Sequence, residues 1–578
     1  QSGSQLGLRR TTVKPHAHQN GSYLANVVGG RLTADQSTLY RIARRMVFSV
    51  VNPSDGWFRD TIYANISDGV VVTGNVAAVR SLGGNISDRE LPFFDTNLGD
   101  RPFRNPYLAP LFDHHGNGVA TFRPLAISPA FNTRTGAHPP PTQIITVTTL
   151  ADENDTPAGA QISLREAIRD IADGGVIVFD PLLNNGTIEL TLNSSAINTL
   201  NKSVTIDATT LPHGITIIGR LVSTSPGRTL GLHGIHFRNH DPGFAVGGAV
   251  AIQNGNLVGS HLAFSRLNSD QAGGAIYLEG GQLVLENVTF SSNSAPSGAA
   301  IGLVNATGTI EFATFGEQRG SAAAVIEGAN ARIHLHGSVF FKNERSAFSG
   351  VTLVSEGYNA FPGNPAGTIG TDSVNNGTLA TAYDRFNWYG GWVWSYRPNE
   401  IATNVMNTLP LVMAGTAPPP LSDARGFIRV AGASADWGAH EFGGGTFDSD
   451  GDGLYDWWEL AQGFDPNTFT DPDQDLDGDG WSLIEEQGWG TDPFSTNSSP
   501  GAVLTIAGTG PYTVEARVNS IAGELFYFRG TTNVASLGGY NHEVAIGNGF
   551  PMVLTAPLPF LSDTRFYRLE KAVPFGVW

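Results

Sequence analysis

The amino-acid sequence predicts an all-β protein built around a parallel β-helix, followed by a small calcium-binding module and a β-sandwich. Three observations carry this prediction. Phenylalanines recur about every 25 residues in the middle of the chain, acidic residues further on repeat with calcium-loop spacing, and short apolar runs near the end alternate with turn residues. With 578 residues the chain is too long for one ordinary core, so we expect several domains.

Composition and charge exclude several classes of protein. Hydrophobic residues make up 40% of the chain and charged residues 15%, which argues against disorder caused by charge excess. No apolar stretch approaches about 18 residues, so we expect no membrane-spanning helix. The formal net charge of −18 argues against a nucleic-acid partner, which needs a basic face. The absence of Cys excludes disulfides and is typical of exported bacterial proteins.

The phenylalanine repeat defines the central domain. Its members are Phe237, Phe264, Phe290, Phe315 and Phe340, with spacings of 27, 26, 25 and 25 residues. Positions seven and five before each Phe share one strand face, and so do the position two before and the Phe itself. The two positions between these pairs break the alternation, so the chain turns a corner there. Because the units lack a 3.6-residue period, helical repeats are excluded and a parallel β-helix is predicted over 143–442.

A helix is expected near 163–171, at the start of this β-helix. Ser163 and Glu166 have the spacing of a capping box, in which each side chain satisfies an amide of the first turn. Apolar residues on one face of the helix would press onto the first rung. The helix would therefore cover strand edges that otherwise aggregate.

Two acidic loops predict a calcium module over 443–495. Acids stand at calcium-loop positions in both loops, and Gly453 and Gly480 permit the sharp turn. The predicted ligands of the first loop are Asp448, Asp450, Asp452, Asp456 and Glu459, with the Leu454 carbonyl. Those of the second loop are Asp475, Asp477, Asp479 and Glu486, with the Trp481 carbonyl, and Asp473 could bridge the loops. A solvated acidic linker is the alternative, which mutual repulsion of unpaired carboxylates disfavours.

Several segments resemble a family of bacterial surface proteins. They are Ser-Leu-Arg-Glu-Ala-Ile at 163–168, the Phe-x-x-Asn pattern from Phe290 to Asn293, and Asp-Trp-Gly-Ala-His-Glu at 436–441. Together they resemble β-helices of the polymorphic-outer-membrane-protein or choice-of-anchor kind. The acidic loops are similar to thrombospondin type-3-like or dockerin-like calcium repeats. The resemblance implies a right-handed helix and a secreted or cell-surface location.

The two ends of the chain add further modules. Residues 1–136 resemble the C-terminal part of a first β-helix module that is incomplete at its start, and 137–142 form a Pro-rich linker. Residues 500–578 alternate apolar and polar side chains in short runs, which predicts a small β-sandwich. Either the chain is cut from a longer precursor, or its open first rung is completed by another molecule. In the second case we expect head-to-tail self-association into a filament.

The function predicted from these features is that of an extracellular structural protein, not an enzyme. It would form or anchor a surface assembly such as a filament, sheath or adhesin, braced by Ca²⁺, and surface glycans are a second class of partner. The alternative is a polysaccharide lyase or hydrolase. Glu286 and Glu311 both stand four residues before a repeat Phe, so they would stack at an outward-pointing corner and could act as acid or metal ligand. No Arg or Lys accompanies them in that column.

Overall fold

The fold is described from a computed structural model. It describes residues 5–9, 12–13, 23–28, 31–42, 46–51, 55–66, 70–74, 79–112, 120–157, 159–199, 201–238, 243, 246–320, 324–374, 377–399, 401–410, 418–431, 434–489, 491–496, 503–507, 512–519, 525–531, 540–546, 551–558 and 566–572. The chain divides into two compact units. Unit 1 comprises Gln1–Ser449 and Tyr455–Pro466, and unit 2 comprises Asp450–Leu454 and Asn467–Trp578.

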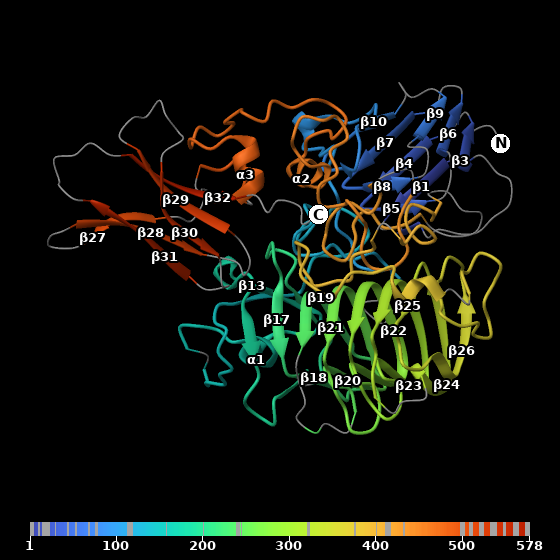
Figure 1. Ribbon diagram of the computed structural model, residues 1–578. Coiled ribbons are helices and arrows are strands. Elements are labelled where there is room, and N and C mark those ends of the chain that lie inside the picture. Colours follow the sequence, from blue (N-terminus) through green and yellow to red (C-terminus); the bar gives the residue numbers. More distant parts are fainter. Residues whose placement is uncertain are drawn as a thin grey trace. The chain divides into compact units, whose positions relative to one another are not determined.

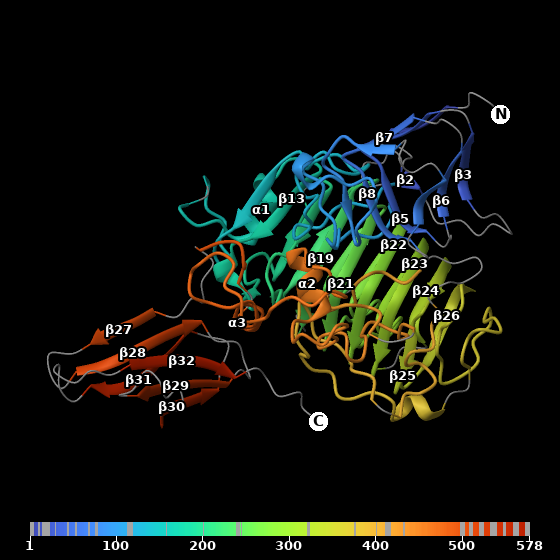
Figure 2. The ribbon, with the colours of Figure 1, turned by 90° about the horizontal axis from the view of Figure 1, so that it is seen from above.

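Unit 1 is a parallel β-solenoid, with about 11 turns in all, which confirms the predicted fold class. Successive strands of each sheet lie one rung apart in the sequence and pair in parallel (Figure 1). Seen from above, the strands from β13 to β26 lie side by side along the stack (Figure 2). None of the described helices is long and apolar enough to cross a membrane.

The first part of unit 1 is a three-sided solenoid with a period near 24 residues. One sheet contains β1 (Gln5–Arg9), β4 (Arg31–Asp35), β7 (Asp55–Arg59) and β10 (Val79–Ser81). A second contains β2 (Thr12–Val13), β5 (Thr38–Ile42), β8 (Ile62–Ile66) and β11 (Ile86–Ser87). The third contains β3 (Tyr23–Val28), β6 (Met46–Val51) and β9 (Val70–Gly74). A 3₁₀ turn, η2 (Thr96–Leu98), follows them.

The second solenoid begins with β12 (Ile144–Val147) and the helix α1 (Leu164–Asp170). The Ser163 hydroxyl accepts a hydrogen bond from the Glu166 amide, and the Glu166 carboxylate accepts one from the Ser163 amide at 2.9 Å. This is the expected capping box. Ile168 and Ile171 of this segment belong to the same buried cluster as the first strands of the stack. The helix therefore packs onto the first rungs.

The remaining strands of the second solenoid form one continuous parallel sheet system. They are β13 (Gly175–Phe179), β14 (Thr187–Glu189), β15 (Ala196–Asn198), β16 (Val204–Asp207), β17 (Ile215–Ile218), β18 (Arg220–Ser223), β19 (Thr229–Arg238), β20 (Val250–Gln253), β21 (Asn256–Ser265), β22 (Ile276–Ser291), β23 (Ile301–Gly316), β24 (Ala324–His336), β25 (Val339–Phe341) and β26 (Ser346–Ser355). Two 3₁₀ turns, η3 (Pro181–Leu183) and η4 (Gly377–Ala380), lie in connections.

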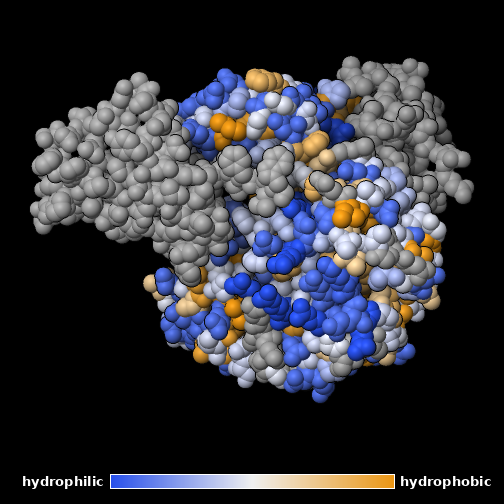
Figure 3. Space-filling view, in the orientation of Figure 1, coloured by the Kyte–Doolittle hydropathy of each residue, from blue (hydrophilic) through white to orange (hydrophobic). Residues whose placement is uncertain are grey.

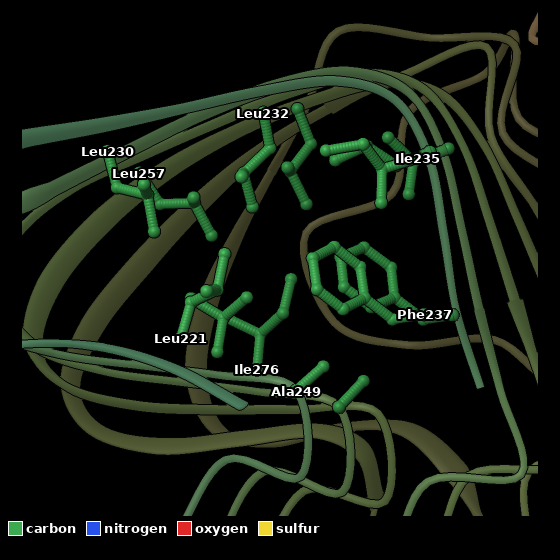
Figure 4. Close-up of a cluster of buried hydrophobic side chains, with 14 of the residues drawn as sticks. Leu221, Leu230, Leu232, Ile235, Phe237, Ala249, Leu257 and Ile276 are labelled. Atoms are coloured by element: carbon green, nitrogen blue, oxygen red, sulfur yellow. The ribbon is translucent and has the colours of Figure 1, made fainter. Parts of the chain in front are cut away.

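The five phenylalanines of the repeat stack inside the coil. Their ring centroids are 5.4, 5.1, 4.7 and 4.4 Å apart in chain order, and all five side chains are fully buried. The strand register pairs Phe237 with Phe264, Phe264 with Phe290 and Phe290 with Phe315, so the sequence alignment of the rungs is confirmed. Leu, Ile and Ala side chains from the other strands fill the rest of the interior (Figure 4).

The corner before each Phe is made by a residue in the left-handed region. The residue three before the Phe has φ between 53° and 69° in all five rungs, as the broken alternation predicted. Gly234 and Gly337 adopt this conformation without strain, whereas His261, Asn287 and Phe312 carry side chains there. Since this residue turns the chain, the strand segments on its two sides face different directions within the same sheet system.

The solenoid ends earlier than the sequence predicted. The β-helix was expected to reach residue 442, but the last described strand of the stack is β26. The described residues between 377 and 442 instead fold back along the flank of the coil. There Trp392, Val393 and Ala424 pack against Ala263 of β21 and against Tyr107 of the first solenoid. This return segment therefore covers one side of the coil and joins the two solenoids within unit 1.

Two further helices and six strands lie in the described residues after 442. The helix α2 (Asp456–Gln462) belongs to unit 1, and α3 (Leu483–Trp489) belongs to unit 2. Unit 2 ends in two three-stranded antiparallel sheets. The first sheet contains β27 (Val503–Ala507), β28 (Tyr512–Asn519) and β31 (Pro551–Leu558). The second contains β30 (Tyr540–Ile546), β29 (Leu525–Thr531) and β32 (Phe566–Ala572).

Candidate functional site

The second acidic loop gathers three carboxylates in unit 2. One carboxylate oxygen from each of Asp475, Asp477 and Asp479 lies within 4.8 Å of the other two. Carboxylates this close repel one another unless protons or a cation neutralise them. The loop therefore has the donor type that hard cations such as Ca²⁺ prefer.

Hydrogen bonds within the loop fix its shape. Asp475 accepts from the amides of Gly478 and Gly480 at 2.8 and 2.9 Å. Asp477 Oδ1 accepts from the Asp479 amide at 3.1 Å, and Asp479 Oδ1 accepts from the amide two residues further on at 3.0 Å. Because Asp477 and Asp479 each use one oxygen to shape the loop, the second oxygen of each is left for another partner.

Those second oxygens are buried and unsatisfied. Asp477 Oδ2, Asp479 Oδ2 and Glu486 Oε2 have no hydrogen-bond partner among the described residues. Glu486 is 0% exposed, and its Oε1 accepts from the Thr491 hydroxyl at 3.3 Å. Burial raises the pKa of Glu486 to about 7, and the charges of Asp477 and Asp479 act in the same direction. Buried anionic oxygens without donors are costly, and a bound cation would remove that cost.

The position of Glu486 follows from the start of α3. Ser482 donates from its amide and its hydroxyl to Glu485 Oε2, at 3.2 and 3.1 Å, which stabilises the first turn. Leu483 is fully buried beneath that turn. This helix start orients Glu486 inward, while the neighbouring Glu485 holds the helix cap.

Two other residues of the second loop, Trp481 and Asp473, are also predicted ligands. Trp481 is half-buried, and its amide donates a hydrogen bond to Asp479. This contact is compatible with a Trp481 carbonyl that faces a cation. Asp473 is exposed, and its amide donates to Asp471 Oδ1 at 3.2 Å. The bridging role of Asp473 stays a prediction.

The predicted ligands of the first loop are distributed over both units. In unit 2, Asp450 and Asp452 each have a carboxylate oxygen within 4.8 Å of the other. Asp452 accepts from the Leu454 amide at 2.8 Å and from the Thr470 amide at 2.7 Å. Leu454 is fully buried, and the Gly453 carbonyl accepts from Gln487 of α3 at 3.2 Å. These contacts attach the middle of the first loop to the module that holds the second.

Asp448, Asp456 and Glu459 belong to unit 1. Asp456 accepts from the amide and hydroxyl of Ser449 at 2.7 and 2.6 Å, and Glu459 is fully buried in α2. The helix is held by Trp457, whose indole N–H donates to the Gly445 carbonyl at 3.1 Å. Calcium binding by the first loop stays a prediction.

The two glutamates of the alternative enzyme site are neighbours in the sheet. Strand register pairs Ser260 with Glu286, Glu286 with Glu311, and Glu311 with His336, which is the column that the repeat predicted. The expectation that this column points to solvent is wrong at Glu286, which is only 6% exposed. The return segment covers the corner, since Asn287 Nδ2 donates to the Ser422 carbonyl at 2.9 Å.

A buried arginine of the return segment lies at the same corner. Arg429 donates to the Gly438 carbonyl at 2.9 Å and to the Asn287 side chain, and its guanidinium lies 4.9 Å from the Phe312 ring centroid. Burial lowers the pKa of Arg429, while carboxylates that include Glu286 act in the opposite direction. The expectation that no basic residue accompanies these glutamates considered only the column itself, and Arg429 is far away in the sequence.

Comparison with known proteins does not assign this chain to a family. Neither a protein-family model nor a curated protein matches this sequence. The arguments for function therefore rest on the chain's own residues.

Proposed function

We propose that this chain is a calcium-braced structural protein of the cell exterior, which forms or anchors a surface assembly such as a filament, sheath or adhesin. Its solenoids would supply the elongated, stackable part of the assembly, and the acidic loops would bind Ca²⁺. The resemblance to bacterial surface β-helices and to tandem calcium repeats points the same way. A Cys-free, acidic chain suits export from a bacterial cell.

The observation that carries the proposal is the group of unsatisfied carboxylate oxygens in the second loop. Asp477, Asp479 and Glu486 each direct a buried oxygen to no described donor, and Asp475 lies beside them. A proton on Glu486 would relieve part of the repulsion, whereas a calcium ion would use all of these oxygens together. A module ordered by Ca²⁺ in this way suits the high calcium concentration outside cells.

Self-association is supported by the last strand of the coil. β26 is ten residues long and pairs with β24. No other described strand pairs with its second edge, where the Ser355 amide at the strand end donates to the Gly367 carbonyl at 3.4 Å. The strand carries no charged residue and no proline, the two devices that commonly protect an edge from pairing. Phe348 and Val351 pack onto the core and hold the backbone in place. We infer that this edge receives a strand of another copy, which would extend the stack head to tail.

The enzyme alternative has less support. A catalytic carboxylate must reach its substrate, and Glu286 is covered by the return segment. Glu286 therefore fits a buried structural role near Arg429 better than a role in a lyase or hydrolase centre.

Calcium binding is tested by isothermal titration of the full chain with CaCl₂. Glu486→Gln keeps the shape of the side chain and removes its charge, and Glu485→Gln is the matched control on the same helix turn. We expect Glu486→Gln to weaken the second site at least about tenfold, because an anionic ligand is lost. Equal titrations of both variants and the wild type would contradict calcium binding at this loop.

Assembly is tested with two threonines of the same column. Thr352 on β26 and Thr307 on β23 are both exposed, and each is paired with Arg332. Thr352→Lys adds a charge to the open edge, whereas Thr307→Lys adds the same charge to an interior strand. We expect light scattering to show polymers in the wild type and in Thr307→Lys but not in Thr352→Lys. Polymers that persist in Thr352→Lys would exclude this edge as the contact.

A further inference from the structure

A groove of about 660 Å³ runs along the second solenoid, on the side that follows the phenylalanine ladder. Its floor comes from the ends of β19, β21, β22 and β23 and the turns after them, and its wall comes from residues 385–394 of the return segment. All of these residues belong to unit 1. Strongly hydrophilic side chains gather over this set of strands on the surface (Figure 3). The volume falls within the range of pockets that hold small organic ligands.

The groove is basic although the chain is acidic. Its lining includes Arg238, Arg266, Arg319 and Arg385 against one carboxylate, that of Glu317. No ion pair joins these four arginines to a carboxylate in the part of the chain that the structure describes. In a protein with a net charge of −18, four uncompensated guanidinium groups around one groove indicate an anionic ligand.

Two nitrogens of the lining residues are buried without hydrogen-bond partners among the described residues. His236 is 3% exposed, and its Nε2 lies 2.7 Å from the Ser265 hydroxyl, but its Nδ1 has no hydrogen-bond partner among the described residues. Arg238 Nε is also buried and has no hydrogen-bond partner among the described residues. Burial lowers the pKa of His236 to about 3, so the ring is neutral near pH 7. Both nitrogens lie beneath the surface of the groove, so hydrogen bonds to a ligand come from the exposed Arg319 and Arg385 side chains.

Aromatic rings form the opposite wall. Trp394 and Phe386 lie with ring centroids 5.7 Å apart, and Trp394 lies 5.6 Å from the His236 ring. Trp394 is half-buried, so part of the indole is open to the groove. A sugar ring has an apolar C–H face that packs on an indole and hydroxyl edges that bond to Ser and Arg side chains. Guanidinium groups bind carboxylates with two parallel hydrogen bonds.

The lining of the groove also repeats from rung to rung, as a binding site for a polymer would. Arg238, Ser265 and Ser291 are register partners on successive rungs, so equivalent positions recur at one strand spacing, about 4.8 Å. Solenoids commonly bind extended ligands along such repeated surfaces. We propose that this groove binds a linear acidic oligosaccharide, whose carboxylate groups pair with the arginines and one of whose rings packs on Trp394. Nucleic acid fits less well, because single strands need several aromatic faces for stacking.

The sequence alone did not reveal this site. Its arginines follow the repeat phenylalanines at different distances: Arg238 one residue after Phe237, Arg266 two after Phe264 and Arg319 four after Phe315. An alignment of the turns would have shown Arg after Phe237, Phe264 and Phe315 but not after Phe290. The wall residues come from the return segment, whose position no repeat predicts.

Binding is tested by titrating the full chain with a galacturonate hexamer, with cellohexaose as the neutral probe and with a deoxythymidine hexamer as the nucleic-acid probe. Arg319 and Arg385 are exposed, so Arg319→Gln and Arg385→Gln remove charge without disturbing the core. Arg332→Gln is the matched control, an exposed arginine of β24 outside the groove lining.

We expect the galacturonate hexamer to bind with an affinity that falls as salt rises, and cellohexaose to bind at least about tenfold more weakly. Each groove variant should lower the galacturonate affinity about threefold to tenfold, and Arg332→Gln should leave it unchanged. Three results would overturn the proposal: no binding of the galacturonate hexamer, tighter binding of the deoxythymidine hexamer, or an equal loss in Arg332→Gln. Calcium binding in unit 2 is independent of each outcome.

Discussion

Phe290 and Phe315 stack with their ring centroids 4.7 Å apart and an interplanar angle of 1°. Their strands, β22 and β23, pair over most of their length, so the two rings repeat the spacing of the backbone. Each ring in the ladder is the packing partner of the ring before it and the ring after it. The core of the solenoid is therefore cooperative along its length, and the loss of one ring affects two interfaces.

Phe290→Ala should destabilise the solenoid by about 3–5 kcal/mol, since it removes a fully buried ring from the middle of the ladder. Chemical denaturation followed by circular dichroism measures the change. Phe469→Ala is the control, because that ring is 68% exposed. Similar midpoints for the two variants would contradict the role of the ladder.

Asn293→Ala should cost about 2–4 kcal/mol through unsatisfied backbone groups. The buried Asn293 side chain accepts from the Leu267 amide at 3.1 Å and donates to the Phe264 carbonyl at 3.0 Å, so it links two rungs. Gln282→Ala, at an exposed position of β22, should be close to neutral. The same denaturation experiment compares them, and a neutral Asn293→Ala would show that these bonds are replaced by water.

His261 should make the solenoid sensitive to acid. Burial lowers the pKa of His261 to about 3, and the charge of Arg429 acts in the same direction. The unfolded chain takes up this proton below about pH 6.5, so the stabilising contribution is complete above that pH and is lost as the pH falls towards 3. At pH 5 the loss is about 2 kcal/mol.

His261→Asn tests this dependence, because Asn287 occupies the equivalent left-handed position in the next rung, with φ of 59° against 55°. The free energy of unfolding should fall less between pH 7 and pH 5 in the variant than in the wild type, by about 2 kcal/mol. An identical pH dependence would mean that the ring is protonated in the folded protein.

Calcium should stabilise unit 2 more than magnesium does. The orphaned oxygens of Asp477, Asp479 and Glu486 suit a large cation with many oxygen ligands, whereas Mg²⁺ keeps most of its water. At a calcium concentration about 100 times the dissociation constant, stabilisation should reach about 2.7 kcal/mol. Calorimetry of the full chain in each salt measures the shift, and equal transitions in calcium, magnesium and chelator would exclude a specific site.

Part of the fold could be predicted because one residue type marks five successive rungs. The spacing of the repeat Phe residues fixed the strand register from β19 to β25, and the interrupted alternation located the left-handed corner at positions such as Asn287. The grouping of Asp475, Asp477 and Asp479 could also be predicted, since the three lie within five residues of one another, whereas calcium binding there stays a prediction. Short-range periodicity and loop spacing are local properties of the sequence.

The parts that could not be predicted depend on contacts between distant segments. Residues 377–442 have no repeat, so nothing local indicated that Ser422 and Arg429 would cover the corner at Asn287. The burial of Glu286 and the wall of the basic groove both follow from that packing. Site prediction from the rungs alone therefore mistook a covered corner for an exposed one.

The measurement that tests the central claim most directly is negative-stain electron microscopy of the purified full chain, first in calcium and then in excess chelator, beside Thr352→Lys. We expect elongated polymers in calcium, fraying of those polymers on chelation, and single particles for Thr352→Lys. Single particles of the wild type under both conditions would contradict a calcium-braced assembly.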